Sequence, residues 1–277
     1  MTEQGAPARL PAWSEPFSAP NRPALARSGP LAIARAAAFG SADGRGVTVA
    51  IVDSGIEPDH PAVGGRVTRH VRVTVISGEP RVVDDDEPID AVGHGTACAG
   101  IVHALAPAAE FVSVRVLGPD NRAPGLLFAA AIEWVAGQGI PVANLSLSSR
   151  KEALFGALHH LADEAYFANT LLVCAANNLP GPSYPSLFAS VVSVAAHDVP
   201  DPWTWYYNPR PPVEFGAWGV DVPVAWQGGG RIVATGNSFA APHVSGLAAL
   251  IRSAHPSASP FEMKALLAAT ASPVPGS

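Results

Sequence analysis

The stretch Val47-Thr48-Val49-Ala50-Ile51-Val52 carries no charge and is rich in β-branched side chains. A strand with one face in water alternates apolar and polar residues, whereas this run is apolar apart from one threonine. Such a run suits a strand that is buried on both faces, as in a parallel sheet with helices on its two sides. The stretch therefore predicts an α/β fold.

Helix and strand patterns alternate on the C-terminal side of this stretch. Helices are predicted over 97–104, 126–137, 153–168, 243–253 and 261–270, and strands over 110–116, 142–147, 170–175 and 191–196. Alternation of this kind is typical of a three-layer, doubly wound α/β domain, a mostly parallel sheet with helices on both faces. Such domains carry their functional sites at the carboxyl ends of the strands.

The N-terminal side of the stretch is different in composition. Residues 1–30 are rich in proline and alanine, which predicts an arm, and a short helix is expected over 31–39. No repeat or second domain boundary is recognisable in the remainder. We therefore expect one domain over 31–277, preceded by the arm.

The composition narrows the classes of partner. A net charge of -6 argues against nucleic acid and anionic membranes. The chain has no apolar run of 18 residues and no pattern of a signal peptide, so neither a transmembrane helix nor secretion is expected. Two cysteines, Cys98 and Cys174, cannot build a disulfide framework. These features favour a cytoplasmic protein and leave its oligomeric state open.

Three polar residues stand where chemistry is expected. Asp53 follows the first strand directly, His94 lies between two glycines ahead of a helix, and Ser238 opens a helix of small residues. Each also has an ordinary interpretation, respectively a turn aspartate, a loop histidine and a helix N-cap. Peptide hydrolysis by a nucleophile needs a serine, a histidine to take its proton and a carboxylate to orient the histidine. Together the three residues therefore indicate a catalytic triad.

The blocks around these residues resemble those of a known family. Asp-Ser-Gly at 53–55, His-Gly-Thr at 94–96 and the stretch 236–243 resemble, in this order, the signature blocks of the subtilisin-like serine peptidases. The resemblance implies that Ser238 is the nucleophile, His94 the general base and Asp53 its orienting carboxylate. It also implies that Asn178, at the end of a predicted strand, donates to the oxyanion together with the Ser238 N–H.

The resemblance also implies a substrate cleft. Two extended segments, 118–123 and 145–149, are expected to pair with the peptide backbone. Val92 is expected to line the subsite beside the scissile residue. Including the end of the oxyanion strand, the expected substrate-binding residues are Val92, Gly118, Asn121, Ala123, Leu145, Ser146, Ser148, Ala176 and Asn177.

The chain departs from the family at several positions. Asn237 stands where a threonine usually precedes the nucleophile, and its amide is expected to be able to donate to the oxyanion. The segment 103–108 lacks the loop of the main calcium site, and Ala62 occupies the place of an aspartate ligand. That site is therefore expected to be absent, and no cofactor or metal is expected. No folding-assisting propeptide is expected before residue 31.

Three further features have open interpretations. Cys98, one turn beyond His94, resembles the thiol-dependent branch of the family, although a small core residue is the simpler interpretation. The acidic run 84–87 is expected to be a solvated loop, with attraction of basic substrates as the alternative. The aromatic segment 203–212 is expected to pack in the core, with a binding surface as the alternative.

The sequence thus predicts a serine endopeptidase that acts on peptides or proteins through a covalent acyl-enzyme. A dedicated role in peptide maturation is compatible with this prediction. The alternatives are a peptide transferase or macrocyclase, in which an amine replaces water, and a catalytically weak interaction module with the same fold.

Overall fold

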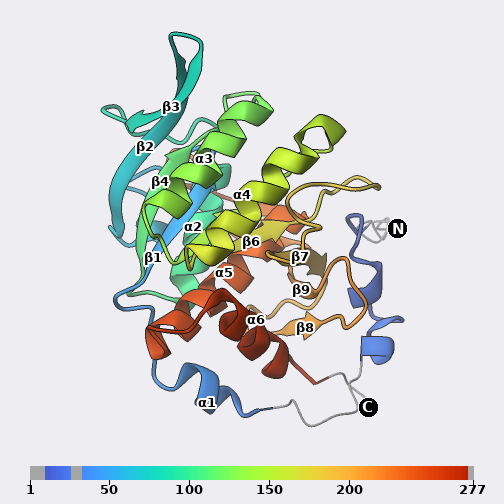
Figure 1. Ribbon diagram of the computed structural model, residues 1–277. Coiled ribbons are helices and arrows are strands. Elements are labelled where there is room, and N and C mark those ends of the chain that lie inside the picture. Colours follow the sequence, from blue (N-terminus) through green and yellow to red (C-terminus); the bar gives the residue numbers. More distant parts are fainter. Residues whose placement is uncertain (1–9, 26–32, 274–277) are drawn as a thin grey trace, which may run out of the picture.

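A nine-stranded sheet forms the centre of the computed structural model, which describes residues 10–25 and 33–273 (Figure 1). The strand order is β3-β2-β4-β1-β5-β6-β7-β9-β8. Neighbouring strands from β2 to β9 are parallel, and only β3 and β8 at the edges are antiparallel. The strands are β1 Thr48–Asp53, β2 Val67–Ile76, β3 Glu79–Asp84, β4 Glu110–Arg115, β5 Val142–Leu145, β6 Leu171–Ala175, β7 Val192–His197, β8 Trp205–Tyr207 and β9 Phe215–Trp218.

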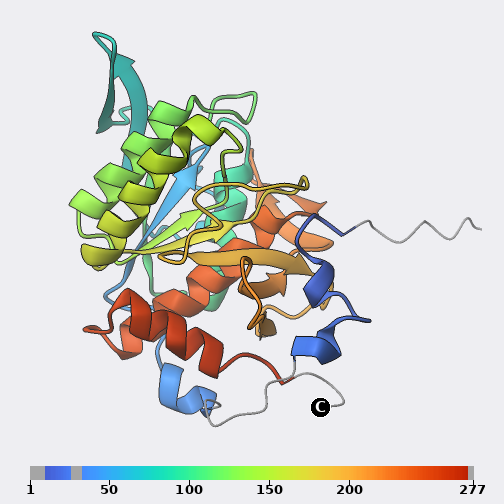
Figure 2. The same cartoon turned by 45° about the vertical axis from the view of Figure 1, so that its right-hand side comes forward.

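Helices cover both faces of the sheet (Figure 2). One face packs against α1 Arg35–Phe39, α2 His94–Leu105, α5 Asn237–Ala254 and α6 Pro260–Ala269. The other face packs against α3 Gly125–Gly137 and α4 Phe155–Phe167. Short 3-10 helices occupy Glu15–Phe17, Arg22–Leu25, Pro61–Val63 and Glu152–Leu154, and a separate hairpin is formed by β10 Val222–Trp226 and β11 Gly230–Ala234. No helix within the described residues is long and apolar enough to cross a membrane.

The central strand explains why this sequence forms such a sheet. In β1, Val49 and Ile51 face the core beneath α2 and α5, and Ala50 and Val52 face the core beneath α3 and α4. All four side chains are fully buried. The uncharged run therefore lies between two helical layers, and the predicted doubly wound α/β fold is confirmed.

Several strands were not expected from the sequence. The β2–β3 hairpin lies at the edge of the sheet and exposes many of its side chains, so it has no uniform apolar run. Strands β8 and β9 contain only three and four residues. Such elements are stabilised by pairing with neighbours, which a local pattern does not reveal.

The acidic run 84–87 is not simply a solvated loop, and that prediction is wrong for two of its residues. Asp84 ends β3, and the side chain of Asp85 is only 5% exposed. Arg115 donates to Asp85 from Nε and Nη2, each over 2.8 Å. A buried carboxylate paired in this way stabilises the edge of the sheet and is not available to attract substrate.

The aromatic segment 203–212 does contribute to the core. Trp205 is fully buried, and its Nε1–H donates to the carbonyl oxygen of Leu267 over 2.9 Å. Its ring packs edge-on against Phe39. The interpretation as core packing therefore holds for Trp205.

A buried histidine predicts acid lability. His197 is fully buried, accepts from the N–H of Val199 at Nδ1 and contacts the Thr204 carbonyl oxygen at Nε2. This pair of contacts requires a neutral ring, and burial lowers the pKa of His197 to about 4. In the unfolded chain His197 takes up a proton near pH 6.5, whereas in the folded protein it stays neutral down to about pH 4. The stabilisation of the folded state by the neutral ring is therefore complete above pH 6.5 and is lost as pH falls toward 4. The expected loss is roughly 3 kcal/mol.

Urea unfolding at pH 7 and pH 4.5 measures this effect. The variant His197→Asn keeps an acceptor for Val199 but does not titrate. It should lose clearly less unfolding free energy on acidification than the unmodified protein. An equal loss in the two proteins would assign the acid lability to other groups.

Candidate active site

A cleft of about 530 Å³ lies at the carboxyl ends of β5 and β6 and the N-termini of α2 and α5. His94, Asn178 and Ser238 line it. Asp53, the last residue of β1, is completely buried behind His94. Four side chains from segments far apart in the sequence therefore meet at the end of the sheet where the fold predicts a site.

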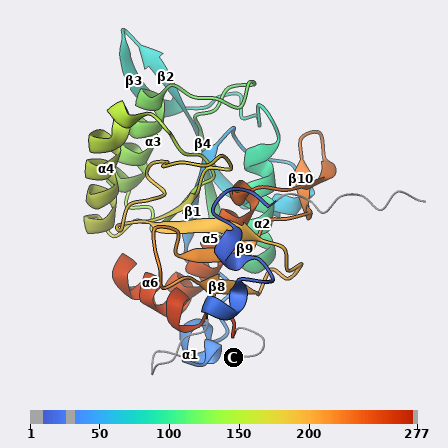
Figure 3. The ribbon, with the colours of Figure 1, turned by 90° about the vertical axis from the view of Figure 1, so that its right-hand side faces the viewer.

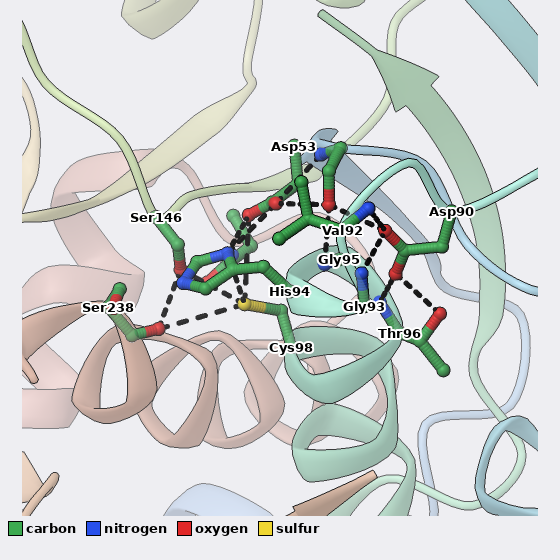
Figure 4. Close-up of polar contacts among 12 residues, drawn as sticks. Asp53, Asp90, Val92, Gly93, His94, Gly95, Thr96, Cys98, Ser146 and Ser238 are labelled. Carbon is green, nitrogen blue, oxygen red and sulfur yellow. Dashed lines mark hydrogen bonds and ion pairs between the residues drawn. The ribbon is translucent and has the colours of Figure 1, made fainter. Parts of the chain in front are cut away.

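Asp53 and His94 form a close buried pair (Figure 4). His94 Nδ1 lies 2.8 Å from Oδ1 and 2.9 Å from Oδ2 of Asp53. Oδ1 also accepts from the backbone N–H of Ser54 over 2.7 Å. Because a carboxylate only accepts, the Nδ1 atom of His94 carries the proton and Nε2 is left as the acceptor.

The charge of Asp53 changes the titration of His94. Burial lowers the pKa of His94, but the adjacent carboxylate more than offsets this, and the pKa lies well above the usual value. Burial raises the pKa of the nearby Cys98 thiol, which is therefore neutral at neutral pH. The charge that favours the imidazolium is thus that of Asp53.

Glycines on either side let His94 approach Asp53. Gly93 has φ of 105°, a conformation that favours glycine, and a Cβ there would lie 2.9 Å from the Trp226 ring. A Cβ on Gly95 would lie 2.0 Å from the carbonyl oxygen of Gly55. Gly95 therefore allows the start of α2 to pack directly on the loop that follows β1, and Gly93 allows the preceding turn to pack on the end of β10.

Asp90 is a second buried carboxylate beside the pair, and it was not among the candidate residues identified from the sequence. Its Oδ1 accepts from Ser54 Oγ, Val92 N and Gly93 N over 2.7, 3.0 and 2.6 Å. Its Oδ2 accepts from N and Oγ1 of Thr96 over 2.7 and 2.6 Å. Asp90 thereby fixes the turn that carries His94 (Figure 4). Its only signal in the sequence is its position four residues before the histidine.

Ser238 lies in the first turn of α5, and its carbonyl oxygen has an unusual environment. Pro242, four residues on, has no N–H to donate to this carbonyl. The Ser146 hydroxyl donates to it instead over 2.8 Å, and Ser146 in turn accepts from Asn144 Nδ2. These hydrogen bonds therefore connect the end of β5 to Ser238, whose side chain lines the cleft.

The Ser238 hydroxyl and the Asn178 side chain lie on the same side of Gly236. A Cβ on Gly236 would lie 3.2 Å from Ser238 Oγ and 3.3 Å from Asn178 Nδ2. The Oδ1 atom of Asn178 accepts from the Asn237 N–H over 2.8 Å. This bond leaves the amide Nδ2 of Asn178 as a donor toward the space beside Ser238.

The expectation that the Asn237 side chain could donate to an oxyanion is wrong. Asn237 is fully buried, and its Nδ2 donates to the carbonyl oxygens of Ala12, Ala176 and Asn177 over 3.0, 3.1 and 3.4 Å. Its Oδ1 accepts from the Ala196 N–H over 2.9 Å. The side chain joins β6, β7 and the arm behind the cleft, and its amide protons are already used.

The expected substrate-binding residues fall into two groups. The cleft is lined by Asn121, Ala123, Ser146, Ser148, Ala176 and Asn177, but not by Val92, Gly118 or Leu145. Leu145 is fully buried in β5, so its side chain cannot reach a substrate.

The two segments expected to pair with substrate are only partly extended. Residues 118–121 form a turn, in which the Asn121 N–H donates to the Gly118 carbonyl oxygen over 2.9 Å and Asn121 has φ of 57°. Ser149 exchanges two backbone hydrogen bonds of 2.8 Å with Tyr184. The backbone of Ser149 is therefore already paired within the protein.

Cys98 lies against the pair formed by Asp53 and His94. Its Sγ is fully buried, 3.8 Å from Asp53 Oδ2, 4.0 Å from His94 Nδ1 and 3.3 Å from Ser146 Oγ. Among the described residues, Asp53, His94 and Cys98 form a group whose ligand atoms lie near enough to one another to share a metal ion. The short Asp53–His94 hydrogen bond already occupies Nδ1, so the geometry favours a proton-bearing pair.

Mercurial reagents should test this contact. A mercury atom on Cys98 would displace the His94 ring, so treatment should lower any activity that depends on His94 by more than about tenfold. The variant Cys98→Ala should resist the reagent. Cys174 is also buried and unpaired, and Cys174→Ala, as the matched control, should remain sensitive. If Cys98→Ala remained sensitive to the reagent, inactivation through Cys98 would be refuted.

Comparisons with known proteins agree with the geometry. Residues 44–277 match the Subtilase family, Peptidase_S8. Subtilisin BL of Lederbergia lenta is 33% identical over 241 residues, covering 82% of this chain and 84% of that protein. Thermitase of Thermoactinomyces vulgaris is 31% identical over 262 residues, with coverage of 90% and 89%. A solved structure of a cold adapted subtilisin-like serine proteinase has a TM-score of 0.67 and 28% identity, covering 82% of each chain.

Proposed function

The chain belongs to the subtilase family and is a serine-type endopeptidase, and we propose that it hydrolyses peptide bonds with Ser238 as nucleophile, His94 as general base and Asp53 as the orienting carboxylate. The observation that carries this proposal is the buried Asp53–His94 pair beside Ser238 in one cleft. The same arrangement of roles defines a serine triad.

The proposed reaction has two stages. Ser238 Oγ attacks the scissile carbonyl carbon, and His94 Nε2 takes the hydroxyl proton. His94 then gives this proton to the leaving amine as the peptide bond breaks and an acyl-enzyme forms. Water, deprotonated by His94, hydrolyses the ester and regenerates Ser238. Asp53 stays ionised and stabilises the imidazolium in both stages.

Two donors are proposed for the negative charge that develops on the carbonyl oxygen. One is Asn178 Nδ2, whose orientation is supported by the Asn237 N–H bond at Oδ1. The other is the Ser238 N–H, which lies in the first turn of α5, where backbone donors have no partner within the helix. All groups of this reaction come from the protein, so the proposal includes no cofactor and no calcium requirement for catalysis.

The proposal also covers the domain organisation of the chain and its location in the cell. We infer one peptidase domain over 31–277 that follows the arm 1–30, and a peptide or protein as substrate. The two cysteines are free thiols, which supports a reducing, cytoplasmic location. The relatives compared above are named as a subtilisin, thermitase and a proteinase, which supports hydrolysis over transfer to an amine.

Labelling with a fluorophosphonate probe tests the proposed function. The probe should modify the protein once, at Ser238, and peptide mapping should locate the adduct there. A peptide library should be cleaved before labelling and remain intact after it. Labelling elsewhere, or cleavage that survives labelling, would refute the assignment.

The cleft also supports a preference in substrate charge. Arg122 and Lys151 line it from opposite segments, and within the described residues no aspartate or glutamate does. Asp120, two residues before Arg122, and Glu152, directly after Lys151, lie outside the lining. We therefore expect acidic substrate residues on this side of the scissile bond to be preferred over basic ones. Such selectivity would suit a protease that matures particular peptides.

Charge reversal measures this preference. Matched peptides that differ only in carrying Glu, Gln or Lys at one position should differ in kcat/KM. Arg122→Glu and Lys151→Glu should each reduce the ratio of kcat/KM for the Glu peptide to that for the Lys peptide by about two- to fivefold. The effect is modest because both cations are exposed. The effect should shrink in salt. Arg81→Glu, an exposed change on β3 with the same change in net charge, is the control. Equal kcat/KM values for all peptides would contradict the expectation.

A further inference from the structure

The arm lies directly behind the two residues that flank the proposed oxyanion site. The Ala12 N–H donates to the carbonyl oxygen of Asn178 over 3.2 Å, and Asn237 Nδ2 donates to the Ala12 carbonyl oxygen over 3.0 Å. Ser14 Oγ donates to Asn237 Oδ1 over 3.4 Å. Two residues of the arm thus hold both Asn178 and the residue before Ser238.

The arm is anchored next to these contacts. Phe17 is fully buried against β9, where Gly216 leaves room for its ring: a Cβ on Gly216 would lie 2.4 Å from the Phe17 ring. Arg22 donates to the Phe17 carbonyl oxygen over 2.8 Å, forms an ion pair with Asp198 and lies over the Tyr206 ring. Figure 3 shows the arm, in blue, across β9. Apolar burial and charge therefore both fix where Ala12 and Ser14 lie.

The docked arm also carries local strain. Trp13 has φ of 71°, which is rare for a bulky residue, and its buried indole N–H has no partner among the described residues. Such outliers persist only where surrounding contacts determine the conformation, and they concentrate at functional sites. The strained residue lies between Ala12 and Ser14, the two residues that contact the site.

The described part of the arm, residues 10–25, does not obstruct the cleft. None of its described residues, 10–25, lines the cleft that contains His94 and Ser238. Residues 10–25 therefore leave the lining of the cleft free for substrate. The arm instead forms hydrogen bonds with the backbone of Asn178 and with the side chain of Asn237. The backbone N–H of Asn237 in turn orients the Asn178 side-chain amide.

From these contacts we propose that the docked arm is a positioning element for the oxyanion site: Ala12 and Ser14 hold Asn178 and Asn237 where stabilisation of the transition state requires them. This inference rests on the proposed function. Loosening the arm lowers kcat and leaves KM nearly unchanged, because the substrate cleft is intact and only a transition-state interaction weakens.

The test compares two Phe→Ala variants of the full chain. Phe17→Ala removes the anchor of the arm, and Phe39→Ala removes a buried ring on α1 that belongs to a different core cluster from Phe17. Well below the melting temperature of either variant, Phe17→Ala should lower kcat about tenfold with KM within about twofold. A peptide boronic acid, which mimics the tetrahedral state, should bind about tenfold more weakly to it. Phe39→Ala should lose stability but keep kcat.

Ser14→Ala provides a second, milder variant that does not depend on a large cavity. It should lower kcat about two- to threefold, in proportion to one neutral hydrogen bond. Unchanged kcat and boronate affinity in both arm variants, or equal losses in Phe39→Ala, would overturn the inference. A wild-type protein that neither cleaves peptides nor labels at Ser238 would refute the proposed function itself, so the two failures are distinguishable.

Discussion

Replacement of Ser238 by alanine is expected to lower kcat by about 10⁶-fold, the loss known for the nucleophile of subtilisin itself. The hydroxyl is the group that attacks the peptide bond in the proposed mechanism, and without it no acyl-enzyme can form. Residual cleavage should come only from oxyanion stabilisation and binding. Steady-state hydrolysis of a peptide, with active-site titration of the unmodified enzyme, measures the loss.

The fold should be unaffected by this change. Among the described residues, the Ser238 hydroxyl has no hydrogen-bond partner, and the Ser146 bond goes to the backbone carbonyl, which alanine retains. Ser253→Ala is a matched control on the same helix, since its hydroxyl donates to the Arg45 carbonyl oxygen far from the cleft. Activity in Ser238→Ala within about a hundredfold of the unmodified enzyme would mean that another group is the nucleophile.

The parts of the site that the sequence predicted are those with local signals. Asp53 follows an uncharged strand, and His94 lies between glycines whose backbone conformation and close packing exclude other residues. The start of α6 is equally local: a capping box is present, in which Ser259 and Glu262 each accept from the other's backbone N–H. Signals of this kind can be recognised in the sequence without knowledge of the tertiary structure.

The parts that could not be predicted depend on distant partners. The Asn237 side chain would be free to donate to an oxyanion if the carbonyl oxygens of Ala12, Ala176 and Asn177, all distant in the sequence, did not accept from it. Asp85 appears solvated in an acidic run until Arg115 is placed beside it by the pairing of β2 with β4. Asp90 lies three residues beyond this acidic run, and only the packing of α2, from which Thr96 donates to it, distinguishes it from the acidic residues of the run.

Asp53→Asn is expected to lower kcat by about 10⁴-fold, because the asparagine amide would select the wrong tautomer of His94. Oδ1 accepts from the Ser54 N–H, so the amide oxygen takes that place and the NH₂ group takes the place of Oδ2. The NH₂ then donates to His94 Nδ1, which must lose its proton. The proton moves to Nε2, the atom that has to receive the hydroxyl proton of Ser238.

The pH dependence separates this effect from a general loss of structure. The base form of His94 exists only above its raised pKa, so kcat/KM of the unmodified enzyme should rise as pH increases through that value. In Asp53→Asn the carboxylate charge is gone and burial lowers the pKa of His94, so the rise should move to lower pH. Asp85→Asn, an equally isosteric change at a buried carboxylate outside the cleft, should lower the melting temperature but leave both kcat and this profile unchanged. If Asp53→Asn kept the profile of the unmodified enzyme, the charge of Asp53 would not be what sets the titration of His94, and its role would reduce to holding the ring in place.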